Sequence, residues 1–381
     1  MTNTLNWLEA DIEHSAPWHA ENGTPPPKRV IIVDDTLNAD TAHRLACEGN
    51  GLLYRGDFNN ARLLLQALAR RIDRPRKKPA KKAESPAQAF HLNRQSQSLR
   101  ARVLGMVLIE LEADYRIPLR RAPDVKAAYT QVLGEHHPAF VTSLRELLSV
   151  ISAYEWRKKG VEIPEISGRI YPHYGVFSPI RGEYISLVAK APLPSTELAF
   201  DIGTGTGVLA AVLARRGVKQ IIATEQDPRA IKCAQENIDQ LGLNTQVEII
   251  AADLFPTGRA PLIVCNPPWL PARPNTPIEH AIYDFDSQML RNFLNGLSAH
   301  LTADGEAWLI LSDLAEHLEL RSRETLLEWI NSAGLAVIDR LQTKPHHPKA
   351  NDPTDPLYQA RSAEITSLWR LKLKSDISQP D

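Results

Sequence analysis

The feature that most constrains the fold is an alternation of two patterns of apolar residues that begins near residue 196. Short apolar runs, as expected of buried strands, alternate there with helical segments of about 10–15 residues. This alternation is typical of βαβ units and a parallel sheet. The last two apolar runs, 335–342 and 365–373, follow each other without a helical pattern, which predicts an antiparallel final strand. The sequence therefore predicts an α/β, Rossmann-like sheet of seven strands in residues 196–375.

The first half of the chain has a different texture. Residues 1–35 carry few periodic apolar positions and three consecutive prolines, so we expect a flexible arm. Residues 36–160 show apolar residues at helical spacing, which predicts a mostly helical domain. Within it, residues 70–82 hold eight basic residues against one acid, and an exposed basic linker is expected over 70–89. Residues 161–195 would lead into the catalytic domain.

Composition excludes several classes of protein. With 44 Lys and Arg against 45 Asp and Glu, the net charge is -1, which excludes a generally basic nucleic-acid coat but not a local patch. Three cysteines without a CxxC pair argue against a disulfide scaffold and a cysteine-based metal site. Arg120 and Arg121 are expected on a solvated face rather than around a phosphate. No apolar run approaches the ~18 residues of a membrane span, and no signal peptide is recognisable, so a cytoplasmic protein is expected.

A glycine-rich turn follows the first predicted strand, with the sequence DIGTGTG over residues 201–207. Glycines allow positive φ and let a ligand approach the backbone closely. Asp201, at the carboxyl end of the strand, can accept hydrogen bonds from an ammonium group or from nearby donors. The residues expected around the ligand in this turn are Asp201, Gly203, Thr204, Gly205 and Gly207.

Two further acids end the next two predicted strands. Glu225 can accept hydrogen bonds from two ribose hydroxyls, and Asp253 can accept from an adenine amino group. Glycine spacing alone leaves a dinucleotide site for NAD or FAD open, although the GxGxxG pattern is not met.

The fourth predicted strand ends in Asn266-Pro267-Pro268-Trp269. Two prolines stop the strand and fix the loop, at the edge where open α/β sheets place their ligands. The Asn266 side-chain carbonyl and the Pro267 backbone carbonyl can both accept hydrogen bonds from one NH2 group. Trp269 can stack on the planar group that carries this nitrogen, or pack as a core residue. Cys265 is expected to be a small buried residue rather than a nucleophile.

Together these motifs resemble the class I S-adenosylmethionine-dependent methyltransferases. The resemblance covers residues 172–374 in order, from DIGTGTG through Glu225 and Asp253 to NPPW. It is closest to the amino-methyltransferases with an Asn/Asp-Pro-Pro-aromatic loop, which include nucleic-acid N-methyltransferases and release-factor glutamine methyltransferases. It implies S-adenosylmethionine as cofactor, Asn266, Pro267, Pro268 and Trp269 as catalytic residues, and a cofactor-covering segment that contains Phe177.

The resemblance implies N-methylation, with the helical domain at 36–160 as the substrate-docking unit, and leaves the substrate open. The basic run at 70–82 favours a base of RNA or DNA, and a protein glutamine amide is the alternative. A small-molecule substrate, a cofactor-binding module without catalysis and a dinucleotide oxidoreductase are less favoured, because NPPW is intact.

Other polar residues have two interpretations each. Asp284 and Asp286 either contact cofactor or substrate, or Asp286 or Ser287 caps the following helix. His346 and His347, in a proline-rich loop, favour a substrate-facing loop over a metal site because adjacent side chains point apart in an extended chain.

Overall fold

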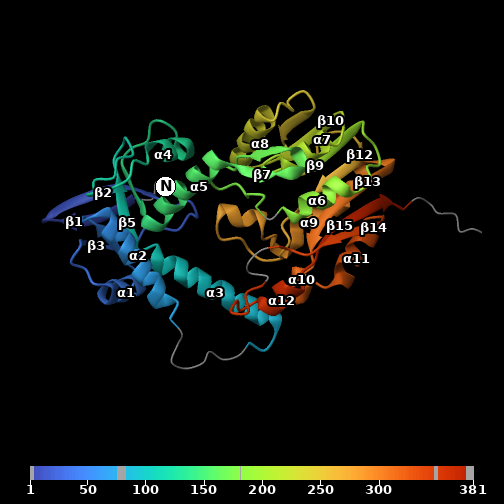
Figure 1. Cartoon of the computed structure of the whole chain (residues 1–381). Coiled ribbons are helices and arrows are strands. Elements are labelled where there is room, and N and C mark those ends of the chain that lie inside the picture. Colours follow the sequence, from blue (N-terminus) through green and yellow to red (C-terminus); the bar gives the residue numbers. More distant parts are fainter. Residues whose placement is uncertain (1–3, 75–82, 181, 347–350, 375–381) are drawn as a thin grey trace, which may run out of the picture. The chain divides into compact units, whose positions relative to one another are not determined.

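The computed structural model describes residues 4–74, 83–180, 182–346 and 351–374 (Figure 1). Its contacts divide the chain into two compact units. The first comprises Met1–Ala83 with His91–Glu155, and the second Glu84–Phe90 with Trp156–Asp381. No helix among the described residues is long and apolar enough to cross a membrane.

The first unit contains a six-stranded mixed sheet in the order β1-β2-β6-β5-β4-β3. Its strands are β1 Thr4–Glu9, β2 Ile12–His19, β3 Arg29–Val33, β4 Asn50–Tyr54, β5 Val107–Leu111 and β6 Phe140–Ser143. Strands β3, β4 and β5 are mutually parallel, whereas β1 with β2 and β5 with β6 form antiparallel pairs. Its helices are α1 Ala39–Cys47, α2 Phe58–Ile72 and α4 Lys126–Leu133, together with most of α3 Pro86–Leu104 and of α5 Leu144–Lys159, whose first and last turns respectively belong to the second unit.

This sheet corrects one prediction and extends another. Residues 1–35 are not a flexible arm, because they supply β1, β2 and β3. Residues 36–160 are mostly helical, as predicted, but they also supply the strands β4, β5 and β6, which were not predicted. The apolar runs of β4 and β5 directly precede and follow helices, so their leucines fit a helical spacing in the sequence. Gly51 allows β4 to pack closely against β5, since a Cβ at this position would lie 2.7 Å from the Leu108 side chain. Residues 75–82 of the basic linker lie outside the described residues.

The second unit confirms the predicted architecture. Its seven-stranded sheet has the order β11-β10-β9-β12-β13-β15-β14, and β15 is antiparallel to both of its neighbours. The strands are β9 Leu198–Ile202, β10 Gln220–Glu225, β11 Val247–Ala251, β12 Ala260–Cys265, β13 Leu301–Ser312, β14 Leu335–Thr343 and β15 Thr366–Leu373. The strand order reverses between β9 and β12, so the loops that follow these two strands flank a switch point.

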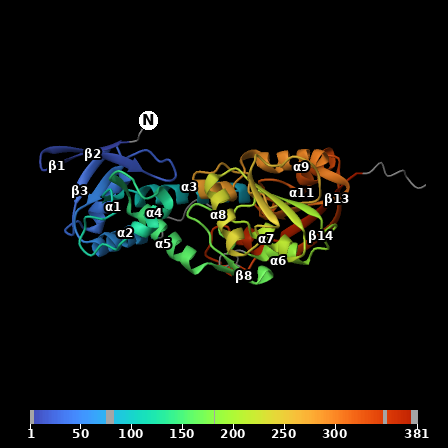
Figure 2. The ribbon, with the colours of Figure 1, turned by 90° about the horizontal axis from the view of Figure 1, so that it is seen from above.

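Helices cover both faces of this sheet (Figure 2). One face packs α6 Glu183–Lys190, α7 Val208–Arg215 and α8 Pro228–Gln240, and the other packs α9 Gln288–His300 and α11 Arg323–Ser332. The short helices are α10 Leu314–His317 and α12 Tyr358–Ala363, and α12 is a helix between the last two strands that the sequence did not predict. A hairpin, β7 Val161–Ile163 and β8 Gly168–Ile170, precedes α6.

Candidate active site

The glycine turn connects β9 to α7 and requires its glycines. Gly203, Gly205 and Gly207 have φ values of +70°, +57° and +82°, which side chains rarely adopt. The backbone N–H groups of Gly203 and Thr204 donate to the Thr224 carbonyl of β10, at 3.0 and 2.9 Å, and fix the turn against the sheet. An added Cβ at Gly205 would meet no atom within 4 Å, so a ligand can approach the backbone there.

Asp201 lies beneath this turn and is 1% exposed. Its Oδ2 accepts hydrogen bonds from the Thr204 hydroxyl at 2.6 Å and from the Ala210 backbone N–H at 3.1 Å. Burial raises the pKa of Asp201 to about 6, although these two bonds oppose the shift. The sequence left open whether Asp201 accepts from an ammonium group or from nearby donors, and in the structure it accepts from nearby donors. The hydrogen bond between Thr204 and Asp201 stabilises the turn.

Glu225 ends β10 and is half-buried beside the turn. Its Oε2 accepts from the Gly205 N–H at 3.1 Å, and its Oε1 accepts from the N–H groups of Gln226 at 2.8 Å and Asp227 at 3.2 Å. A carboxylate oxygen has two lone pairs, so this pattern orients Glu225 and leaves it able to accept further hydrogen bonds.

Asp253 follows β11 and is exposed. The loop that carries it is held against the end of β10, because the Thr224 hydroxyl donates to the Leu254 carbonyl at 2.5 Å and the Ala252 N–H donates to the Glu225 carbonyl at 3.1 Å. The turn, Glu225 and Asp253 therefore follow three adjacent parallel strands at the same edge of the sheet.

One residue that fixes the glycine turn in place was not identified from the sequence. Asn237 of α8 is fully buried; its Nδ2 donates to the Thr206 carbonyl at 3.0 Å and its Oδ1 accepts from the Tyr171 N–H at 2.8 Å. It joins the glycine turn to the segment that leads into the catalytic domain. A polar residue on the apolar face of a helical pattern is the signal that identifies such a position.

The loop after β12 begins at Asn266. Strand pairing aligns Cys265 with Ile202, so Asn266 and Gly203 follow neighbouring strands at the switch point. Pro267 and Pro268 are buried, and Trp269 is half-buried against the cores on both faces of the sheet. The Trp269 indole Nε1 donates to Asn266 Oδ1 at 2.8 Å, a contact that the sequence did not predict.

The acids before α9 have structural roles. Asp284 is 8% exposed, and its two carboxylate oxygens accept from the N–H groups of Met289 and Leu290, both at 3.0 Å. Ser287 occupies the N-cap position, one of the two options considered from the sequence, but the hydrogen bonds that cap the helix are accepted by Asp284. Asp286 forms an ion pair with Arg291 at 2.9 Å.

The remaining predicted residues divide between the two units. Phe177 is half-buried in the loop after β8, and its contact with a cofactor stays a prediction. His346 is exposed, and His347 lies outside the described residues. Burial raises the pKa of Cys265 well above its ordinary value, which disfavours the thiolate that a nucleophile requires.

In the first unit, Arg120 and Arg121 pair with Asp35 and Asp57 at 2.5 and 2.6 Å. Both arginine side chains are exposed, as expected of a solvated face. The ion pairs give each guanidinium a carboxylate partner in place of a phosphate.

Comparison with known proteins shows that part of this chain is similar to methyltransferases. Residues 168–328 match the family model of the methyltransferase small domain. A protein named as an N5-glutamine methyltransferase of Methanocaldococcus jannaschii is 27% identical over 42% of this chain and 82% of its own length. The tRNA1(Val) (adenine(37)-N6)-methyltransferase of Shewanella loihica is 31% identical over 35% of this chain and 59% of its own length. A methyltransferase structure from Pyrococcus furiosus, 18% identical, covers 60% of this chain and 98% of its own with a TM-score of 0.39, which is too low to support a conclusion.

Proposed function

We propose that this chain transfers a methyl group from S-adenosylmethionine to a planar amino or amide nitrogen of a macromolecule, in keeping with the match of residues 168–328 to the methyltransferase small-domain model. The observation that carries the proposal is the strand register at the switch point. The pairing of Cys265 with Ile202 brings the acceptor group of Asn266 beside the glycine turn, so that one reacting nitrogen can face both.

The residues present fit S-adenosylmethionine. Gly205 leaves open space above its backbone, and Glu225 keeps acceptor capacity suited to two ribose hydroxyls. Asp253 would accept from the adenine amino group, and the turn would contact the methionine part. When bound, the cofactor supplies an electrophilic methyl group on its sulfonium.

The chain's own contribution lies in orientation and charge. The delocalised lone pair of an amide or aromatic amine is a poor nucleophile. Acceptors on its two hydrogens, Asn266 Oδ1 and the Pro267 carbonyl, would favour the reactive geometry and stabilise the developing positive charge. An amide oxygen has two lone pairs, so Asn266 can accept from Trp269 and from substrate at the same time. Trp269 would thus orient Asn266 in addition to covering the planar substrate group.

The favoured substrate is a base of RNA. The basic run at 70–82 suits a phosphate backbone, and the Shewanella loihica relative is named for an adenine of tRNA. The Methanocaldococcus jannaschii relative is named for a glutamine, so a protein glutamine amide is the second candidate. Both acceptors carry an NH2 group on a planar carbon, which is the group that Asn266 and Pro267 would recognise.

Transfer of tritiated methyl groups tests the proposal. The full chain with labelled S-adenosylmethionine is incubated with RNA, DNA and protein fractions from cells that lack it. Label in RNA supports the favoured substrate, and label in protein alone supports the glutamine amide. Absence of label from all macromolecular fractions would contradict macromolecular methylation and favour a small-molecule substrate.

Salt dependence separates the two candidates further. If the basic run engages about four phosphates, the log–log slope of RNA affinity against salt should be about -3 to -4. Replacement of five of its residues by serine should flatten the slope and leave cofactor affinity unchanged; the five are Arg76, Lys77, Lys78, Lys81 and Lys82. A slope near zero in the wild-type protein would favour the protein substrate.

A further inference from the structure

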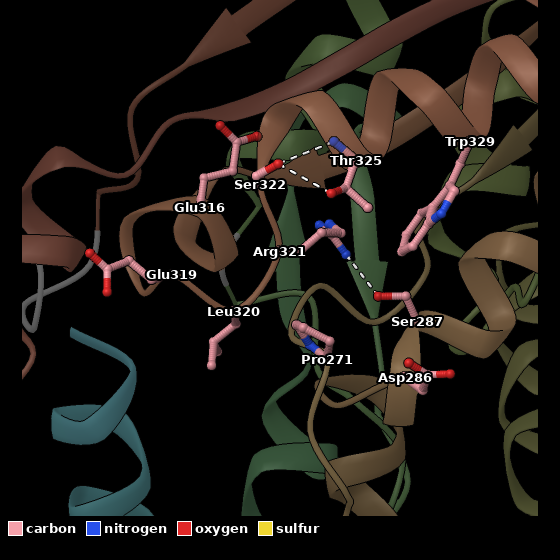
Figure 3. Close-up of a pocket in the computed structure, with 10 residues that line it drawn as sticks. All are labelled: Pro271, Asp286, Ser287, Glu316, Glu319, Leu320, Arg321, Ser322, Thr325 and Trp329. Atoms are coloured by element: carbon pink, nitrogen blue, oxygen red, sulfur yellow. Dashed lines mark hydrogen bonds between the residues drawn. The ribbon is translucent and has the colours of Figure 1, made fainter. Parts of the chain in front are cut away.

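A hollow in the second unit is lined by residues to which the proposed reaction assigns no role. It has a volume of about 460 Å³ and lies between the loop before α11, the start of α9 and the segment just after NPPW (Figure 3). The side chains that line it are Pro271, Asp286, Ser287, Glu316, Glu319, Leu320, Arg321, Ser322, Thr325 and Trp329. The volume is within the ~300–1,000 Å³ range of small-molecule sites.

Two acids of this lining already have cationic partners. Glu316 accepts from Arg323 through both carboxylate oxygens, at 2.8 and 3.0 Å, and Asp286 pairs with Arg291. The third acid of the lining, Glu319, is exposed. Arg321, at the centre of the hollow in Figure 3, has no carboxylate within ion-pair distance among the described residues, although the charges of Glu316 and Asp284 act on it from farther away.

Arg321 is buried without adequate compensation. It is 7% exposed, its Nη1 donates to the Ser287 hydroxyl at a long 3.3 Å, and its Nε is buried with no hydrogen-bond partner. Burial lowers the pKa of Arg321, yet a guanidinium stays charged in proteins. An unpaired buried cation is costly unless a ligand neutralises it.

The surrounding groups suit a tetrahedral oxyanion. The hydroxyls of Ser287, Ser322 and Thr325 line the hollow with the guanidinium. Ser322 and Thr325 contact each other at 3.2 Å, so either hydroxyl can turn its hydrogen toward a ligand. Arginine presents a fork of N–H donors that matches phosphate oxygens in pairs.

The other wall of the hollow is aromatic. Trp329 is half-buried on α11, and the guanidinium of Arg291 lies 5.7 Å from its ring centroid. In Figure 3 its indole lies beside Arg321. Nucleobases stack on such rings irrespective of sequence. We propose that this hollow binds one nucleotide of an RNA substrate, with its phosphate on Arg321 and its base or sugar against Trp329.

The inference rests on the proposed function only for the identity of the full substrate. Binding alone tests it, with the full chain and adenosine 5′-monophosphate in calorimetry, and with adenosine, inorganic phosphate and acetate as comparisons. Adenosine monophosphate is expected to bind most tightly, inorganic phosphate more weakly and adenosine weakest. Arg321→Met should weaken nucleotide affinity at least about tenfold, since charge-assisted hydrogen bonds are lost.

Arg215→Met is the matched control. It removes one positive charge from α7, on the opposite face of the sheet, and should leave nucleotide affinity unchanged. Arg321→Met should melt at or above the wild-type temperature because it removes an unpaired buried charge. If Arg321→Met fails to fold, Arg321→Lys keeps the charge but loses the fork, and nucleotide affinity should fall by about tenfold.

Several outcomes would overturn the inference. They are no binding of either phosphate compound, binding that Arg321→Met and Arg321→Lys leave unchanged, or Arg321-dependent binding of acetate alone, which would indicate a carboxylate ligand. Label in RNA without nucleotide binding would reject this site and keep the proposed function. Arg321-dependent nucleotide binding without label in RNA would do the reverse.

Discussion

Each unit has a carboxylate at the carboxyl end of a parallel strand, and the two carboxylates differ in their remaining capacity to accept hydrogen bonds from a ligand. In the first unit, Asp35 follows β3 and accepts from the Tyr54 hydroxyl at 2.8 Å and the Asp57 N–H at 3.0 Å, while Arg120 pairs with its other oxygen. In the second, Glu225 accepts only from backbone N–H groups, and no cation pairs with it among the described residues.

The surroundings repeat this contrast. A Cβ at Gly56 would lie 2.4 Å from Asp35 Oδ1, so the closed network leaves no room, whereas Gly205 faces open space. Hydrogen bonds from Asp57 and Tyr54, with Arg120 nearby, lower the pKa of Asp35 to about 2. We infer that acidic residues at the edge of a parallel sheet form a ligand site only where their oxygens can still accept hydrogen bonds.

The largest expected effect belongs to the acceptor loop of the open site. Asn266→Ala removes an acceptor that acts in the transition state, so turnover should fall on the order of 10²–10³-fold while cofactor affinity stays close to wild type. Single-turnover methyl transfer and calorimetry measure the two quantities. Near-normal turnover would refute the role of Asn266, and lost cofactor binding would show that Asn266 mainly shapes the pocket.

Asp201 is intermediate between Asp35 and Glu225, because it is buried with two hydrogen-bond donors but has no cationic partner among the described residues. Its folded pKa, about 6, exceeds the ordinary value of 3.8, so the folded state retains the proton to higher pH than the unfolded state. Stability should therefore decrease as pH rises from about 4 to 6, by at most about 3 kcal/mol. In Asp201→Asn, whose amide oxygen still accepts, this decrease should vanish from denaturant unfolding measured across that range. A pH dependence parallel to wild type would show that Asp201 ionises normally.

Glu225→Ala should weaken S-adenosylmethionine affinity by about 1–3 kcal/mol because hydrogen bonds to a charged group are lost. Glu248→Ala, an exposed carboxylate on neighbouring β11, is the matched control and should bind the cofactor normally. Equal affinities for the two variants in calorimetry would remove Glu225 from the site and make both carboxylates equivalent.

The smallest effect is expected in the closed network. Tyr54→Phe removes one donor to Asp35 and should lower the free energy of unfolding by about 1 kcal/mol. Denaturant unfolding measures this loss, and cofactor affinity should not change. A change in cofactor affinity would mean that the hydrogen bonds around Asp35 influence the cofactor site of the second unit.

The catalytic unit was predictable because its signals are local. DIGTGTG, Glu225 and NPPW each lie at the end of a clearly bounded apolar run, and parallel strands bring such positions to one edge. The contacts that orient these residues were not predictable, since Asn237 with Thr206 and Trp269 with Asn266 depend on side-chain geometry.

The strands of the first unit were not predicted because their sequences lack a distinct strand pattern. Only Ala16 of β2 is buried, so this strand carries almost no apolar pattern. In β4 and β5, five-residue strands adjoin helices, and their apolar residues fit either period. The sheet depends on pairing between distant segments, as between Leu52 and Val107. Sequence periodicity does not report such pairing.

The most direct test of the central claim is calorimetric titration of the full chain with S-adenosylmethionine and, separately, with NAD. The open acceptors of Glu225 and the exposed backbone at Gly205 predict one S-adenosylmethionine bound per chain and no measurable binding of NAD. Binding of NAD with equal or higher affinity, or no binding of S-adenosylmethionine, would contradict the account.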